Sequence, residues 1–277
     1  MKPDLHCHSY YSDGTLAPAT LVQRAIDNGV THLALTDHDC TAGLDVLPPA
    51  IAGITMISGV EISCVWETLE IHVVGLHINR TNPQLMALLA TQQAARRWRV
   101  QAMDKKLEAL GTPGLLAYLE ALPCVAYTRS HVADYLVAQK VCGTRQKAFK
   151  SHLAKRGRIF IEAHWCDLTQ GVAAIQAAGG IAVLAHPGRY PLNRRKLEAL
   201  TSAFKASGGE ALEGSYPNIE ANMMRYLATL AISHDMYVSA GSDFHDTAAT
   251  WTDIGKFPHL SQQVSEHAIW QHPSWIG

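Results

Sequence analysis

The first strand of the predicted fold and the loop that follows it read Pro3-Asp4-Leu5-His6-Cys7-His8-Ser9-Tyr10-Tyr11-Ser12-Asp13-Gly14. Side chains alternate between the two faces of a strand, so His6 and His8 point the same way. Two imidazoles on one face form half of a site for a divalent metal. Asp13 follows in a Ser-Asp-Gly turn, which can fold its carboxylate back over the strand end. The stretch therefore predicts a metal site where the first strand ends.

The composition is that of an ordinary globular protein. The 277 residues carry a formal charge of −1, and 48% of them are hydrophobic. No apolar run reaches the roughly 20 residues that a bilayer span requires, and the start Met-Lys-Pro-Asp leads us to expect no secretory signal. The six cysteines are scattered without a C-x-x-C pair, so we expect reduced thiols. These features predict a cytoplasmic protein that needs neither a membrane nor an obligatory protein partner.

Charge is distributed unevenly along the chain. Residues 80–160 hold 14 of the 23 Lys and Arg but only 4 of the 24 Asp and Glu, so this segment is strongly basic and the remainder acidic. An acidic body suits a protein that collects cations, and a basic segment suits one that receives phosphates. A solvated helical surface rich in Lys and Arg is the simpler alternative.

Hydrophobic periodicity divides the chain into a strand–helix body and one helical block. Residues 1–79 and 161–277 alternate between buried strands and amphipathic helices, which predicts βα units around a parallel sheet or barrel. Asn82-Pro83 begins a long helix, and shorter helices follow, so residues 80–160 are predicted to be a helical insertion. The strands are expected at 3–8, 31–37, 54–60, 71–76, 181–185, 210–216 and 236–240.

Candidate metal ligands lie where the predicted strands end. Barrel enzymes build their sites on the face formed by the C-terminal ends of the strands, so these side chains are expected to meet. Nine ligands are too many for one ion, which indicates two or three divalent ions bridged by a carboxylate. Imidazole and carboxylate ligands without a cysteine set favour Mn²⁺, Fe²⁺ or Zn²⁺. The candidates are His6, His8, Asp13, His38, Glu61, His72, His186, Asp243 and His245; His72 is the exception, near the start of its strand.

The chain resembles the PHP (polymerase and histidinol phosphatase) domain family, in the amidohydrolase superfamily. The resemblance lies in the motifs His6-x-His8, Thr36-Asp37-His38-Asp39, Gly59-Val60-Glu61, His186-Pro187 and Asp243-x-His245. The segments around Arg129 and Arg189 are most similar to bacterial 3′,5′-nucleoside bisphosphate phosphatases, which are also 5′–3′ exonucleases on short RNA. The resemblance implies a distorted (β/α)7 TIM-like barrel with a di- or trinuclear centre, for which Mn²⁺ is our first expectation.

Carried over by position, the resemblance implies three sites, of which the first and the third share Glu61. His6, His8, Glu61 and Asp243 would hold one ion, Asp13, His38 and His245 a second, and Glu61, His72 and His186 a third, for which His131 is a rival ligand.

Substrate contacts are expected beside the ligands and in the basic insertion. Guanidinium groups bind phosphate oxygens in pairs, which favours Arg129 and Arg189. His131 could give a proton to the leaving oxygen or hydrogen-bond phosphate. Tyr10, Tyr11, Trp98 and Trp165 could stack on a base or pack in the core. The expected catalytic residues are Asp13, Glu61 and His131, and the expected substrate contacts are Ser9, Asp13, Arg129, Ser130, His131 and Arg189.

The sequence predicts a metal-dependent phosphoesterase acting on a nucleoside 3′,5′-bisphosphate, such as adenosine 3′,5′-bisphosphate, or on a short oligonucleotide. A phosphatase for another small phosphomonoester, such as histidinol phosphate, is the first alternative. That substrate is a small cation, which the basic insertion disfavours. A nucleic-acid-binding module with weak catalysis is the second alternative, and the complete ligand set argues against it.

Overall fold

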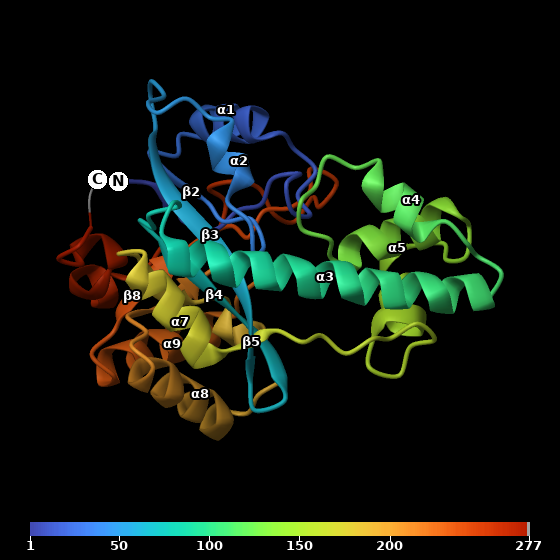
Figure 1. Ribbon diagram of the computed structural model, residues 1–277. Coiled ribbons are helices and arrows are strands. Elements are labelled where there is room, and N and C mark those ends of the chain that lie inside the picture. The colour runs from blue at the N-terminus through green and yellow to red at the C-terminus, as the bar shows by residue number, and fades with distance from the viewer. Residues whose placement is uncertain (276–277) are drawn as a thin grey trace.

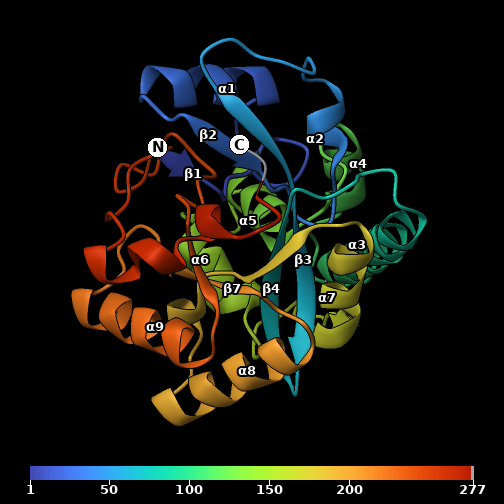
Figure 2. The ribbon, with the colours of Figure 1, turned by 90° about the vertical axis from the view of Figure 1, so that its left-hand side faces the viewer.

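One sheet curls into a nearly closed barrel in the computed structural model, which describes residues 1–275 (Figures 1 and 2). The strands are β1 (Pro3–Asp4), β2 (His32–Leu35), β3 (Thr55–Trp66), β4 (Leu69–Leu76), β5 (Cys166–Asp167), β6 (Ile181–Leu184), β7 (Ala211–Ser215) and β8 (Tyr237–Ala240). Their order is β1-β2-β3-β4-β6-β7-β8, and β5 pairs with β3. The backbone N–H of Leu5 donates to the carbonyl of Ala240 (3.1 Å) and that of Asp243 to His6 (2.7 Å), so the two ends of the sheet meet. The predicted class of an α/β barrel is confirmed.

Helices surround the barrel on its outer side (Figure 2). Apolar side chains of β3, β4, β6 and β7, among them Ile62, Val73 and Leu212, form one fully buried cluster with the helices. Burying such a side chain contributes about 1.5–3 kcal/mol, so this cluster holds the sheet in its curved shape. The surrounding helices are α1 (Pro18–Asp27), α2 (Ala42–Asp45), α7 (Leu168–Ala177), α8 (Arg194–Ala206) and α9 (Ala221–Ser233), and short 3₁₀ helices span Pro187–Arg189, Gln262–His267 and Ile269–Gln271.

The sheet departs from the predicted parallel arrangement at β4. This strand runs antiparallel to both of its neighbours, β3 and β6. The prediction that a strand stops before Glu61 is also wrong, because β3 continues to Trp66 and turns at Glu67-Thr68 into β4. Glu67 adopts a left-handed backbone conformation (φ 54°), as the tight hairpin requires.

Helices between β4 and β5 project from the barrel (Figure 1). Asn82 caps the first of them by accepting the backbone N–H groups of Gln84 and Leu85, as the Asn-Pro start predicts. They share a second apolar cluster that includes Met103, Leu115 and Leu136. The elements are α3 (Pro83–Ala109), α4 (Leu115–Glu120), α5 (Arg129–Ala138), α6 (Arg145–Ala148) and a π-helix (Phe149–Leu153). The last of these shorter helices is thus a short α-helix followed by a π-helical turn.

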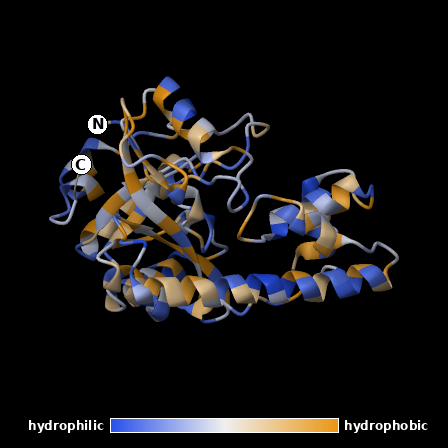
Figure 3. Cartoon of the chain, turned by 45° about the horizontal axis from the view of Figure 1, so that its top comes forward, coloured by the Kyte–Doolittle hydropathy of each residue, from blue (hydrophilic) through white to orange (hydrophobic). Residues whose placement is uncertain are grey.

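Helix α3 belongs to both clusters. Leu85 and Leu89 pack with the barrel core, whereas Val100 and Met103 pack with the projecting helices. Figure 3 shows hydrophilic and hydrophobic residues mixed along α3, in contrast to the hydrophobic strands of the barrel. One continuous helix therefore connects the two parts of the molecule.

A buried ion pair fixes the middle of α3 to the barrel. The guanidinium of Arg96 contacts one oxygen of Asp39 through Nε (2.8 Å) and Nη2 (2.6 Å). Arg96 also donates to the hydroxyl of Ser63 (2.8 Å) and to the carbonyl of Tyr127 (3.1 Å). Both ionic side chains are buried away from water, so each charge needs the other to compensate for its lost hydration.

Two chemical features of the described residues bear on the expectations above. Within residues 1–275, no helix combines the length and apolar character needed to cross a membrane. All six cysteines fall in this range, and all are free thiols.

Replacement of Arg96 by alanine should destabilise the protein strongly. The change leaves Asp39 buried without its counter-charge, which typically costs about 3–5 kcal/mol. Denaturant unfolding of Arg96→Ala should show that loss in the free energy of unfolding. The neighbouring Arg97 is exposed, so Arg97→Ala should stay within about 0.5 kcal/mol of the wild type. Equal stability of the two variants would contradict the anchoring role of Arg96.

Candidate metal centre

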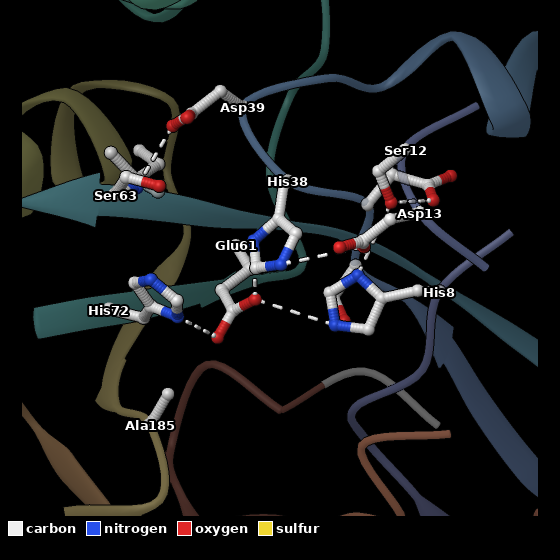
Figure 4. A network of polar contacts seen from close by, with 12 residues as sticks. His8, Ser12, Asp13, His38, Asp39, Glu61, Ser63, His72 and Ala185 are labelled. Atoms are coloured by element: carbon white, nitrogen blue, oxygen red, sulfur yellow. Dashed lines mark hydrogen bonds and ion pairs between the residues drawn. The ribbon is translucent and has the colours of Figure 1, made fainter. Parts of the chain in front are cut away.

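Glu61 lies at the centre of a cluster of histidines. Its side chain is fully buried in the middle of β3, and five imidazoles surround its carboxylate. His38 Nδ1 lies 2.8 Å from Oε2, His72 Nδ1 3.0 Å, His186 Nε2 3.1 Å and His6 Nε2 3.2 Å from Oε1, and His8 Nε2 3.4 Å from Oε2. Figure 4 shows this carboxylate between His72, His38 and His8. Imidazoles from four separate segments therefore surround one carboxylate.

Two aspartates extend the cluster. Asp243 Oδ1 lies 3.4 Å from His6 Nε2 and 3.3 Å from His8 Nε2. Asp13 Oδ1 lies 3.6 Å from His38 Nε2 and 3.3 Å from His245 Nε2. The structure thus brings together all nine residues that the sequence marks as candidate ligands.

The distances group these residues in a way that overlaps with the three expected sites. Within each group the potential ligand atoms lie no more than 4.8 Å apart. His8 falls in two groups, and Glu61 also falls in two, so these residues connect the groups. The groups are His8, Asp13, His38 and His245; His6, His8 and Asp243; His6, Glu61 and His186; and His38, Glu61 and His72.

The direction of β4 explains why His72 appears misplaced in the sequence. His72 lies in the first half of its strand, and it pairs with Ser63 of β3. Because β4 runs antiparallel, its first half lies at the same end of the barrel as the C-terminal ends of the parallel strands. His72 therefore reaches Glu61 from a position that a parallel strand would place at the opposite face.

Other side chains orient the imidazoles. Glu213 of β7 is buried and lies 3.1 Å from His6 Nδ1, which leaves Nε2 of that ring facing Glu61. Ser12 donates its hydroxyl hydrogen to Asp37 (2.7 Å), so its oxygen accepts from His8 Nδ1 (3.3 Å). Each of these contacts turns Nε2 of the ring toward the cluster.

Backbone conformation also places the ligands. His186 (φ 33°) and Asp243 (φ 47°) adopt left-handed conformations, which are uncommon outside glycine and concentrate at functional sites. A Cβ atom at Gly241 would lie 2.4 Å from Cβ of His6. The glycine before Ser242-Asp243 therefore permits the last strand to approach His6 closely.

The protonation of the cluster is set by its own charges. Burial opposes a charge on His72, but Glu61 and Glu70 outweigh it and raise its pKa to about 10. Burial likewise opposes protonation of His245, but Asp13 and Asp243 raise its pKa to about 9. A metal cation bound at His72 and His245 would take the place of the protons that these imidazoles carry without it.

Several buried nitrogen and oxygen atoms of the candidate ligands have no hydrogen-bond partner among the described residues. In the described chain, these atoms contact other ligands but form no aligned hydrogen bond, and burial without a partner is costly. Imidazole nitrogens and carboxylate oxygens are the donors that Mn²⁺, Fe²⁺ and Zn²⁺ accept. The donor set therefore fits divalent ions. The atoms are His6 Nε2, His8 Nε2, Asp13 Oδ1, His38 Nδ1 and Glu61 Oε2.

A basic cleft of about 210 Å³ lies over the cluster, between the barrel and the projecting helices. Arg96, Arg99 and Arg129 contribute to its wall, and Ser130 and Trp165 lie beside them. Glu70 is their acidic neighbour; despite its burial, hydrogen bonding with His72 and the charge of Arg129 hold its pKa far below the usual value. The cleft therefore joins a floor of candidate metal ligands to a cationic wall, which suits a phosphorylated molecule.

Three residues that the sequence predicts to contact substrate instead contact other groups of the protein. Ser9 is buried and donates its hydroxyl to Asp37 (2.7 Å). His131 Nδ1 accepts the backbone N–H of Thr128 (3.1 Å) and completes the capping box of α5. Arg189 pairs with Asp243 and lies 4.9 Å over the ring of Tyr216. Among the predicted substrate contacts, the cleft wall contains Asp13, Arg129 and Ser130.

Sequence reasoning missed two groups of residues. Glu213 contacts His6, and its position in the middle of the predicted buried strand 210–216 is the sequence signal for this role, because buried carboxylates are rare without a partner. Arg96 and Arg99 fall among the basic residues of the long helix, but their inward direction depends on how α3 meets the barrel.

Comparison with known proteins supports the interpretation of the cluster. A PHP domain matches residues 4–166. The chain is 41% identical to the 5′-3′ exoribonuclease of Haemophilus influenzae, over 95% of this chain and 96% of that protein. It is 36% identical to the 3′,5′-nucleoside bisphosphate phosphatase of Chromobacterium violaceum, over 91% of this chain and 90% of that protein.

A solved structure shares nearly the whole architecture. It is an amidohydrolase from Chromobacterium violaceum with bound sulfate and no metal, 35% identical, with a TM-score of 0.89 over 98% of this chain and 95% of that one. The domain match and the near full-length similarity to these relatives show that the chain belongs to the PHP domain family.

Proposed function

We propose that this protein is a metal-dependent phosphatase that removes the 3′-phosphate from nucleoside 3′,5′-bisphosphates and also shortens RNA from its 5′ end. The observation that carries the proposal is the position of Arg99 and Arg129 in the wall above the Glu61 cluster. A molecule with two phosphates can place one on the floor and the other against the wall. The names of the two relatives above support both substrates.

The nine clustered residues are the proposed ligands for two or three divalent ions, with Mn²⁺ as our first expectation. Such ions lower the pKa of a bound water and neutralise phosphoryl oxygens. Glu61 joins the groups, and Glu213 and Ser12 keep the imidazoles of His6 and His8 oriented toward it. Asp13 connects the floor to the cleft wall, which it also lines.

The basic helical segment, residues 80–160, is proposed to form a cap that selects the substrate. It supplies Arg99, Arg129 and Ser130 to the cleft. Arg129 lies 3.5 Å from Glu70, so a phosphate would compete with that carboxylate for the guanidinium. The cationic wall disfavours histidinol phosphate, whose amine would face three arginines. Ser9, His131 and Arg189 act mainly through their protein contacts in this proposal.

Loss of the shared carboxylate should abolish activity through loss of metal. Glu61→Gln removes a charge that lies near five imidazoles, so bound Mn²⁺ and phosphate release from adenosine 3′,5′-bisphosphate should both fall by at least about 10–100-fold. Metal analysis and a phosphate-release assay measure the two effects. The exposed Glu198 provides the control, because Glu198→Gln should change neither. Full activity of Glu61→Gln, or cleavage of histidinol phosphate in place of the bisphosphate by the wild type, would contradict the proposal.

Metal binding should weaken in acid. A bound ion displaces protons from histidines, so the affinity falls as the pH drops from about 8 to about 6. The rise in Tm caused by Mn²⁺ should therefore be smaller at the lower pH, and chelation should remove it at both. A rise that is independent of pH would argue against imidazole ligands.

Arg129 should discriminate between substrates with one and two phosphates. Arg129→Ala removes a charge-assisted hydrogen bond, which contributes about 1.5–3 kcal/mol, so KM for adenosine 3′,5′-bisphosphate should rise by about tenfold or more. KM for adenosine 3′-monophosphate should change little, because it has no second phosphate. Steady-state kinetics with Arg97→Ala as the control test this difference. An equal effect on both substrates would show that Arg129 does not contact the second phosphate.

A further inference from the structure

A second cavity adjoins the metal centre. Its volume is about 390 Å³, and Asp243 and His245 line both this cavity and the basic cleft. A molecule whose reacting phosphate lies at the cluster can therefore extend in two directions. One direction leads into the basic cleft, where the second phosphate of the proposed bisphosphate substrate would lie. The other direction leads into the second cavity, which that substrate would not occupy.

An exposed tryptophan forms part of the second cavity. Trp251 lies in the loop after β8, and 60% of its surface is accessible to solvent. It lines the second cavity together with Ala248, Ala249 and Thr252, whose small side chains leave room beside the indole ring. Two neighbouring cavities, of about 420 and 310 Å³, also border Trp251. The ring is therefore reachable by a ligand that leaves the metal centre on this side.

The charges around this cavity differ from those of the basic cleft. Arg145 is the arginine in the lining of the second cavity. Its guanidinium already pairs with Asp134 and, at 3.2 Å, with Asp246. Asp243 and Asp246 add acidic oxygens to the wall. A second phosphate would meet carboxylates here, whereas an uncharged sugar and base would not. An exposed aromatic face beside small, uncharged side chains such as Ala248 and Ala249 is an arrangement on which nucleobases stack.

We infer that this cavity binds the nucleoside that follows the reacting phosphate in an oligonucleotide, with its base stacked on Trp251. The inference rests on the proposed function. In the bisphosphate, the 3′-phosphate is terminal, and the cavity stays unused. In RNA, the same phosphate is a diester whose O5′ continues into the next nucleoside.

The two reactions then break the same bond. The oxygen of a water molecule bonds to phosphorus, the P–O3′ bond breaks, and O3′ takes a proton. The first nucleoside leaves as its 5′-monophosphate. The phosphate remains as inorganic phosphate in one case and as the new 5′-phosphate of the shortened RNA in the other. Trp251 contributes only to the second case.

Kinetics with two substrates test the role of Trp251. Trp251→Ala should lower kcat/KM for the 5′-phosphorylated dinucleotide pApA by about tenfold, the typical effect of losing one stacking side chain. Activity on adenosine 3′,5′-bisphosphate should remain within about twofold of the wild type, because that substrate has no following base. Trp251→Phe should restore most of the loss. Trp98 is also exposed, at 47%, but lies on α3 outside this cavity, so Trp98→Ala is the control.

Binding to metal-free protein gives a readout that does not depend on catalysis. In the presence of a chelator, the wild type should bind pApA more tightly than the bisphosphate, and Trp251→Ala should remove that difference. Equal losses on both substrates, or an unchanged preference for pApA, would overturn the inference. A wild-type enzyme that hydrolyses neither compound with Mn²⁺ would instead contradict the proposed function, whereas the binding comparison would still report on the cavity.

Discussion

The buried carboxylate of Glu61 is the constraint on which the structure depends. Removing an ionised carboxylate from water costs several kcal/mol unless partners replace the lost solvation. Here the partners are five imidazoles that come from the segments after β1, β2 and β6 and from β4. The barrel must therefore bring its first and middle strands to the same place. The closure of the sheet by the backbone of Leu5 and Asp243 satisfies that requirement.

The cleft depends on a second buried charge. Arg96 on α3 reaches Asp39, the residue after the ligand His38, and so ties the projecting helices to the metal-binding edge of the barrel. Arg99 lies one turn further along the same helix face and lines the cleft. Because α3 is continuous and packs in both apolar clusters, the position of the cationic wall follows from the register of one helix.

Much of the fold and the cluster could be predicted because metal ligands at strand ends have a sequence signature. The two residues of His6-x-His8 share a strand face, and the other ligands follow buried apolar runs. The β3–β4 hairpin could not be predicted, since its turn, Glu67-Thr68, lacks the glycine, asparagine or aspartate that usually marks one. The motifs around His131 and Arg189 could be recognised in the sequence. The partners of the two side chains could not be predicted, because tertiary contacts determine them. The support of His6 by Glu213 likewise depends on strand order, because the two residues lie far apart in the chain.

The closure of the barrel has a consequence for biosynthesis. His6 and His8 follow β1, which ends at Asp4 and not at residue 8 as predicted, while Asp243 and His245 follow β8. A ribosome therefore makes the opening ligands long before their partners, and it must release β8 before the sheet can close. During translation, the early histidines belong to an open sheet with an exposed edge. The complete cluster is a late product of synthesis, whereas the group of His38, Glu61 and His72 lies within the first 72 residues and leaves the ribosome early.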